Sequence, residues 1–234
     1  MIRALLLGIY YAVMIPLVAL VGFPWTLISG RVDRLYQMAM AVTFSGMRLI
    51  GVQVNVIGRE NFDPNGTYIY MCNHVSNLDP PIVVPSIPKR TSVMVKKELF
   101  RVPILAKAML MASFVPVDRT NREAAIASIE AAVDVLKQGV NITIFPEGTR
   151  SPDGKLLPFK KGPFHLAFES KAPIVPMTIF GTEKLMSKGS MKIKGGEATL
   201  IFHAPISPAN YQNREELMAA VRDRIAEGLP PELR

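Results

Sequence analysis

The stretch "YIYMCNHVSNLDPP", residues 68–81, combines the features that organise this chain. Its first five residues are apolar or aromatic, which predicts a buried strand. The polar residues that follow predict a loop. The closing prolines predict the first turn of a short helix at about 80–87, because proline is favoured at that place. The stretch therefore predicts a strand that leads through a loop into a helix.

The same loop carries His74 and Asp79, five positions apart. In one continuous helix their side chains would point about 140° apart and could not meet. The residue before a proline avoids helical geometry, so we expect Asp79 to be the N-cap of the helix and the loop to fold His74 back onto it. An aspartate that accepts from one ring N–H fixes the histidine tautomer and leaves the other nitrogen as a base. The alternative is an ordinary cap beside an unrelated histidine.

Segments typical of strands and of helices alternate along the rest of the chain. Further strands are predicted at 52–57, 91–95, 114–117, 141–145, 173–181 and 198–206, and further helices at 97–112, 121–139, 162–170 and 213–227. This alternation predicts an α/β domain with a mixed, largely parallel sheet flanked by helices.

Charged residues follow two more of these strands. Asp118 and Arg119 come after 114–117, and "FPEGTRS" spans the end of 141–145. In α/β sheets ligands collect at the carboxyl ends of strands, so we expect these segments to form one site with the His74 loop. Gly148 lets the backbone approach a ligand closely, and Arg150 supplies a planar guanidinium suited to phosphate.

The N-terminal segment predicts a membrane anchor. No charge occurs between Arg3 and Arg31, and about 20 apolar residues suffice to span a bilayer core. Pro16 and Pro24 also allow a bent, re-entrant or interfacial arrangement. A signal peptide is the competing interpretation, but its apolar region is typically shorter, about 7–15 residues, and no clear cleavage site follows here.

A second apolar segment, 35–52, predicts an amphipathic helix. We therefore predict a two-helix membrane-anchoring motif in residues 1–50 and an α/β catalytic domain in residues 51–234. The net charge of +8 favours an anionic partner, such as an anionic membrane or a phosphorylated substrate. Nucleic acid is not expected, because the sequence has no recognisable nucleic-acid-binding motif. The single Cys72 excludes an internal disulfide.

Four blocks of the chain, in order and with matching spacing, resemble those of the glycerolipid acyltransferases. The chain resembles the bacterial 1-acyl-sn-glycerol-3-phosphate acyltransferases in particular. The blocks are "NHVSNLD" (73–79), "FVPVDR" (114–119), "FPEGTRS" (145–151) and "IVPM" (174–177). The segment "KKELF" (96–100) also resembles a Lys-x-Glu-Leu segment of that family.

The resemblance implies a reaction. His74, oriented by Asp79, would deprotonate the sn-2 hydroxyl of 1-acyl-sn-glycerol 3-phosphate (lysophosphatidic acid). The alkoxide would attack the thioester of acyl-CoA or of an acylated acyl carrier protein (acyl-ACP) and give phosphatidic acid, without an acyl-enzyme. The acyl donor is a co-substrate, and neither a further cofactor nor a metal is expected.

The resemblance also implies roles for other residues and a location. The substrate's phosphate and glycerol would contact Glu147, Gly148, Thr149, Arg150 and Arg119. Lys96 would face the developing oxyanion. The protein is expected at the bacterial inner (cytoplasmic) membrane, in contact with anionic lipid, with its catalytic domain on the cytoplasmic surface.

Two other classes of protein stay open at this point. Cys72 lies two positions before His74, on the same face if the strand continues, so a hydrolase with Cys72 as nucleophile is one alternative. A non-catalytic protein that binds phospholipid through its basic residues is the other. Within the acyltransferases, glycerol 3-phosphate or another lysophospholipid is an alternative acceptor.

Overall fold

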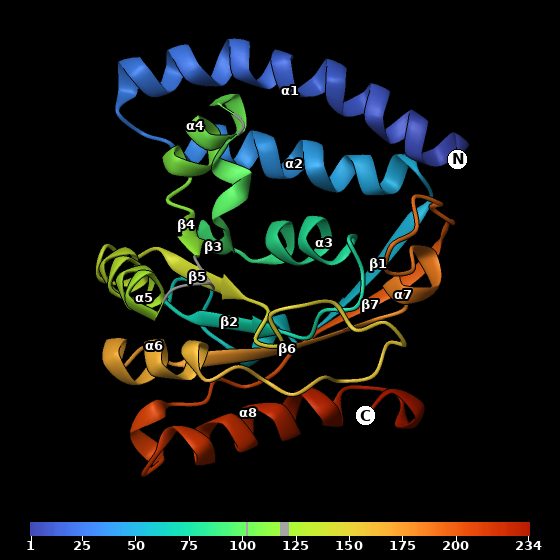
Figure 1. The fold of residues 1–234 in the computed structure, drawn as a ribbon. Helices are drawn as coiled ribbons and strands as arrows, with labels where there is room; N and C mark the ends of the chain where they lie inside the picture. The colour runs from blue at the N-terminus through green and yellow to red at the C-terminus, as the bar shows by residue number, and fades with distance from the viewer. Residues whose placement is uncertain (102, 118–121) are drawn as a thin grey trace.

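The computed structural model describes residues 1–101, 103–117 and 122–234, and seven strands of this part form one sheet (Figure 1). The strands are β1 (Val52–Ile57), β2 (Ile69–Cys72), β3 (Thr91–Lys96), β4 (Val115–Val117), β5 (Asn141–Ile144), β6 (Ile174–Phe180) and β7 (Gly196–Phe202). Their order across the sheet is β1-β7-β6-β2-β5-β3-β4. Neighbours from β6 to β4 are parallel, whereas β7 is antiparallel to β6 and parallel to β1. The predicted mixed, largely parallel sheet is confirmed.

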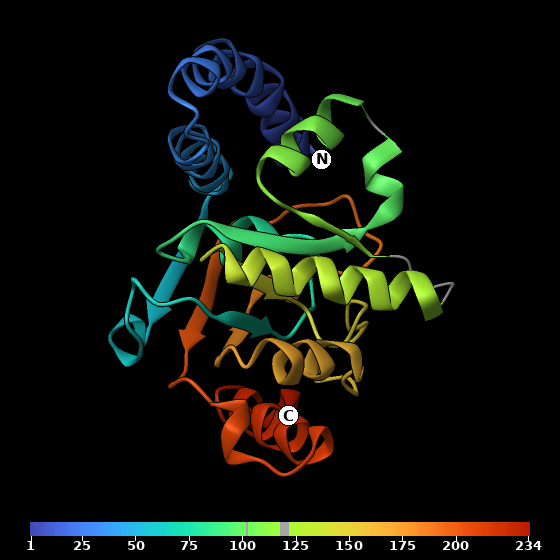
Figure 2. The same ribbon diagram turned by 90° about the vertical axis from the view of Figure 1, so that its left-hand side faces the viewer.

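Helices cover both faces of the sheet (Figures 1 and 2). They are α1 (Ile2–Ser29), α2 (Asp33–Leu49), α3 (Asp79–Ser86), α4 (Pro103–Met111), α5 (Arg122–Lys137), α6 (Gly162–Ser170), α7 (Thr182–Leu185) and α8 (Arg214–Glu227). The predicted helix at 97–112 begins instead as a 3-10 turn, Lys97–Arg101, and α4 follows it. Proline is favoured in the first turn of a helix, which agrees with a separate helix that starts at Pro103.

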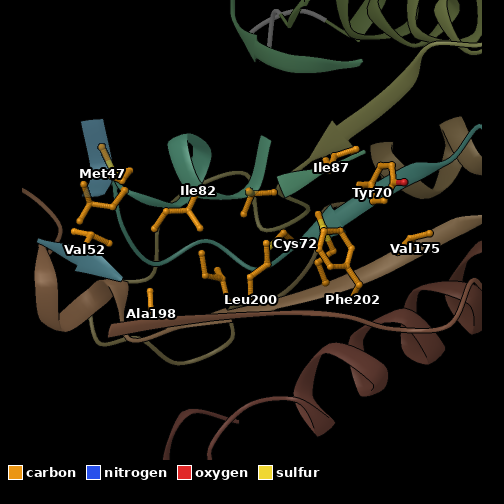
Figure 3. Packing of buried hydrophobic residues seen from close by; sticks show 14 of the residues in the cluster. Met47, Val52, Tyr70, Cys72, Ile82, Ile87, Val175, Ala198, Leu200 and Phe202 are labelled. Carbon is orange, nitrogen blue, oxygen red and sulfur yellow. The ribbon is translucent and has the colours of Figure 1, made fainter. Parts of the chain in front are cut away.

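The two faces of the sheet pack against two separate hydrophobic cores. On β2, Tyr70 and Cys72 belong to the core beneath α2 and α3, which Figure 3 shows in part. Ile69 and Met71, which alternate with them, belong to the core beneath α5, α6 and α8. Because β2 is buried on both faces, its sequence is continuously apolar rather than alternating.

The first two helices form an antiparallel pair at one side of the molecule (Figure 1). Their contacts include a hydrogen bond of 3.2 Å from the Tyr11 hydroxyl to the Thr43 carbonyl. Gly46 permits this approach, since a Cβ there would lie 2.9 Å from the Tyr11 ring. Pro16 and Pro24 stay within α1, which curves but is not interrupted.

In the described part of the chain, α1 is the one helix that is long and apolar enough to cross a membrane. Large apolar side chains along it are exposed: Leu5, Ile9, Val13, Leu17, Leu20, Val21 and Leu27 are among them. An exposed apolar surface of this extent supports association with a membrane. The division into a motif of residues 1–50 and a domain of residues 51–234 stays a prediction.

Candidate active site

The predicted pair of His74 and Asp79 is present: His74 lies in the loop after β2, and Asp79 is the first residue of α3. Nδ1 of His74 lies 2.8 Å from Oδ2 of Asp79. The Asp79 side chain is fully buried, whereas the His74 side chain is 17% exposed. The pair therefore joins an interior carboxylate to a ring that reaches the surface of the site.

Asp79 does not cap the helix, so that prediction is wrong. It is the first residue of α3, and Leu78 occupies the N-cap position without a side-chain cap. Oδ2 of Asp79 accepts the backbone N–H groups of Val75 and Ser76, each at 2.7 Å, in addition to the His74 ring. The carboxylate is therefore directed back to the preceding loop, which it organises.

The loop after β5 holds His74 in place from a second direction. Phe145 stacks on the imidazole, with ring centroids 4.2 Å apart and planes at 28°. The His74 N–H donates to Oε1 of Glu147 at 2.7 Å, and the Ser151 N–H donates to the His74 carbonyl at 2.7 Å. These contacts arise because β2 and β5 are adjacent and parallel, so their carboxyl ends meet at the same edge.

Glu147 binds backbone with both of its carboxylate oxygens. Its Oε2 accepts the Leu157 N–H at 3.0 Å, and the residue is 1% exposed. Burial raises the pKa of Glu147 from 4.5 to about 7, although the two N–H donors and Arg222 partly oppose the shift. In the structure Glu147 therefore clamps the His74 loop to the segment around Leu157. Its predicted contact with substrate stays a prediction.

The second ring nitrogen of His74 is available for chemistry. Asp79 engages Nδ1, and among the described residues no hydrogen-bond partner is found for Nε2. A histidine with one nitrogen hydrogen-bonded to aspartate and the other directed to the open site can act as a general base.

The arginine of "FPEGTRS" has an unused donor. Nη1 of Arg150 is buried and has no hydrogen-bond partner in the described part of the structure, while the Arg150 carbonyl accepts from Nζ of Lys188 at 2.7 Å. A buried guanidinium N–H without a partner is unfavourable unless a ligand completes it. Gly148, with φ of 71°, makes the turn that a side chain would strain.

The remaining predicted residues are less closely tied to the pair. Thr149 is exposed in the same turn, and Lys96 is exposed at the carboxyl end of β3, on the same edge of the sheet. The structure describes no hydrogen bond or ion pair between Lys96 and the pair. Asp118 and Arg119 lie outside the described residues.

Cys72 has the surroundings of a core residue rather than of a nucleophile. It is completely buried, and Figure 3 shows it among the apolar side chains of the core beneath α3. Burial, with the nearby carboxylates of Asp79 and Glu147, raises the pKa of the Cys72 thiol well above its ordinary value. Because the thiolate is the reactive form, these surroundings oppose the hydrolase alternative.

Sequence reasoning missed three residues of this site: Asn73, Phe145 and Thr182. Phe145 looks like the last residue of an apolar strand, and no local pattern marks its ring as a stacking partner. Thr182 is 103 positions from Asp79 in the chain, yet its hydroxyl donates to Oδ1 of Asp79 at 2.5 Å. The Asn73 side chain bonds the backbone of Ile179. Only the fold brings these groups together.

Comparisons with known proteins agree with the fold. The family model "Acyltransferase" matches residues 53–180, which include the His74 pair and the "FPEGTRS" loop. This match defines the class, and the chain belongs to the acyltransferase family.

Individual acyltransferases with a named activity are also similar to this chain. A 1-acyl-sn-glycerol-3-phosphate acyltransferase of Cocos nucifera is 34% identical over 200 residues, covering 85% of this chain and 64% of the relative, just under two thirds of its length. The enzyme of that name from Limnanthes alba is 32% identical over 217 residues, covering 92% and 76%. The crystal structure of the 1-acyl-sn-glycerophosphate (LPA) acyltransferase PlsC from Thermotoga maritima is 28% identical, covers 97% of this chain and 95% of that one, and superposes with a TM-score of 0.76.

Proposed function

We propose that this protein transfers an acyl chain from acyl-CoA or acyl-ACP to the sn-2 hydroxyl of 1-acyl-sn-glycerol 3-phosphate, which gives phosphatidic acid. The observation that carries the proposal is the His74–Asp79 pair, at 2.8 Å, with Nε2 available beside the "FPEGTRS" loop. The relatives described above are named for acylation of this acceptor, which supports the choice.

In the proposed reaction His74 is the general base. Nε2 accepts the proton of the sn-2 hydroxyl as its oxygen bonds to the thioester carbonyl carbon. The carbon–sulfur bond then breaks, and the departing thiolate takes the proton back from the imidazolium. Asp79 steadies the imidazolium through Nδ1. General-base assistance of this kind contributes about 10²–10⁴-fold to the rate.

Arg150 is the proposed ligand of the acceptor phosphate, because its buried Nη1 lacks a partner among the described residues. A guanidinium can bind a phosphate with two parallel hydrogen bonds. Gly148, Thr149 and Glu147 are proposed to shape this subsite, together with Arg119. Lys96, at the carboxyl end of β3, is proposed to stabilise the oxyanion of the tetrahedral intermediate.

The proposed acceptor carries one long acyl chain, so the site must work at a membrane surface. The exposed apolar surface of α1 supports such a location. A net charge of +8 favours contact with anionic lipid. We propose the inner membrane of a bacterium, with the catalytic domain on its cytoplasmic surface.

An acceptor panel tests the proposal. Purified protein in detergent or vesicles is given acyl-CoA, or acyl-ACP in a parallel series, and thiol release is followed with each acceptor. Lysophosphatidic acid is expected to give the fastest release. Faster turnover of glycerol 3-phosphate would assign the first acylation step instead. Thiol release that needs no acceptor would indicate a thioesterase.

A further inference from the structure

The segment that follows β6 holds the catalytic loop from a third direction. The Asn73 side chain accepts the Ile179 N–H at 2.7 Å and donates to the Ile179 carbonyl at 2.8 Å. The Ser76 hydroxyl donates to the Met186 carbonyl at 2.7 Å. Thr182 lies between Ile179 and Met186 in the sequence, and its hydroxyl donates to Oδ1 of Asp79 at 2.5 Å.

The Thr182 contact differs from the other contacts of this segment. It is the one among them that involves the carboxylate of Asp79. Oδ2 of Asp79 accepts from the His74 ring and from two backbone N–H groups, while Oδ1 accepts from Thr182. Both residues are 0% exposed. The hydroxyl therefore supplies Oδ1 with its donor and fixes which oxygen faces His74.

The backbone around Thr182 is built for this placement. Gly181, just before it, has φ of 91°, and a Cβ there would lie 2.7 Å from the Glu197 carbonyl oxygen. Only glycine adopts this conformation without strain and fits this space. The turn at Gly181, directly after β6, brings Thr182 to Asp79 as the first residue of α7.

We propose that Thr182 is a positioning residue that completes a His74–Asp79–Thr182 relay. This inference rests on the proposed acyltransferase function. Thr182 lies beyond the segment that the family model matches, which ends at residue 180. It is buried behind Asp79, so it acts on the acceptor hydroxyl only through the pair. Its loss should therefore lower kcat and leave KM for the acceptor nearly unchanged.

The test compares three variants in the acyl-CoA thiol-release assay. Thr182→Val keeps the shape of the side chain but removes the hydroxyl, and Thr182→Ser keeps the hydroxyl. Thr178→Val is the matched control: Thr178 is also fully buried, but its hydroxyl bonds the Ile225 carbonyl and His203, away from the pair. A melting curve in the same detergent reports the folding of each variant.

Thr182→Val is expected to lose about tenfold or more in kcat, with KM for lysophosphatidic acid within about twofold of wild type. Thr182→Ser should recover kcat to within about threefold, and Thr178→Val should keep kcat within about twofold although its melting temperature falls. A Thr182→Val protein with wild-type kcat would overturn the inference. So would a kcat loss that Thr178→Val shares, since folding alone would then explain it. If wild-type protein released no thiol with any acceptor, the proposed function would fail first, and the inference with it.

Discussion

His74, the proposed base, is held in place by contacts on several sides. Its ring is bonded by Asp79 on one edge and covered by Phe145 on one face. Its backbone N–H and carbonyl are both bonded to the "FPEGTRS" loop. A ring held in this way would lose little freedom when a substrate binds, which suits the proposed role of His74 as the base.

Substitutions of the pair should separate its role from that of Cys72. His74→Ala and Asp79→Asn are each expected to lower kcat by about 10²-fold or more, because they remove the base or its orienting carboxylate. Cys72→Ala should keep kcat within about twofold, since a buried cysteine acts as a small apolar side chain. Thiol-release kinetics check this. Abolished turnover in Cys72→Ala protein that still melts cooperatively would favour the hydrolase.

Arg150 should affect acceptor binding more than turnover. Arg150→Gln removes the charge and the buried donor, so KM for lysophosphatidic acid is expected to rise about tenfold or more. Lys137→Gln, which removes a charge from an exposed position of α5, is the control and should leave KM unchanged. An unaltered KM in Arg150→Gln would exclude Arg150 from the phosphate subsite.

Glu147 should give the protein a pH-dependent stability. Burial raises the pKa of Glu147 to about 7, so the folded protein keeps a proton there, between about pH 4.5 and 7, that the unfolded chain loses. The stability that this group contributes therefore falls as pH rises through that window, by up to about 3 kcal/mol. The melting temperature of wild type minus that of Glu147→Gln should accordingly be larger at about pH 5 than at about pH 7.5.

Glu215 provides the control for this measurement. Its pKa is lowered by the hydrogen bond from Lys161, so its contribution is already complete above its ordinary pKa. The gap between wild type and Glu215→Gln should therefore change little between about pH 5 and about pH 7.5. An equally flat gap for Glu147→Gln would show that Glu147 titrates normally.

Among the helices, α1 is the one that we expect to insert into a membrane. Val13 and Leu20 are 54% and 73% exposed on it. Replacing both with lysine would cost about 5–7 kcal/mol if they lie near the centre of a span. The fraction of protein that sediments with membranes should fall sharply, whereas Ile126→Lys on α5 should not change it. Unchanged sedimentation of the double variant would contradict membrane insertion of α1.

Strand and helix positions could be predicted because they depend on local patterns. The helix predicted at 162–170 is α6 at the same residues, and Gly139 follows the end of α5 with φ of 76°. The bonds from two loop N–H groups to the Asp79 carboxylate could not be predicted, because the path of that loop depends on its contacts with the segments that follow β5 and β6. The contacts of Thr182 and Phe145 depend on the sheet order, which no local pattern encodes.

On the scale of the whole molecule, the sheet order explains why the site forms where it does. β2 lies between β5 and β6. The loop after each neighbour therefore reaches the His74 loop from its own side: Phe145 and Glu147 from β5, and Thr182 from β6. α3 begins at Asp79 and packs against α2. The His74 loop is thus joined directly to the helix pair that includes the exposed apolar surface of α1, which suits the proposed lipid acceptor.

The central claim is that His74 activates the hydroxyl of lysophosphatidic acid for attack on an acyl thioester. The most direct measurement is the rate of thiol release from acyl-CoA by vesicle-reconstituted protein, with and without lysophosphatidic acid, for wild type and His74→Ala. Wild type is expected to show acceptor-dependent release, matched by an equal amount of phosphatidic acid, and His74→Ala is expected to lose about 10²-fold or more of that rate. Equal release by the two proteins, or no acceptor-dependent release by wild type with acyl-CoA or acyl-ACP, would contradict this claim.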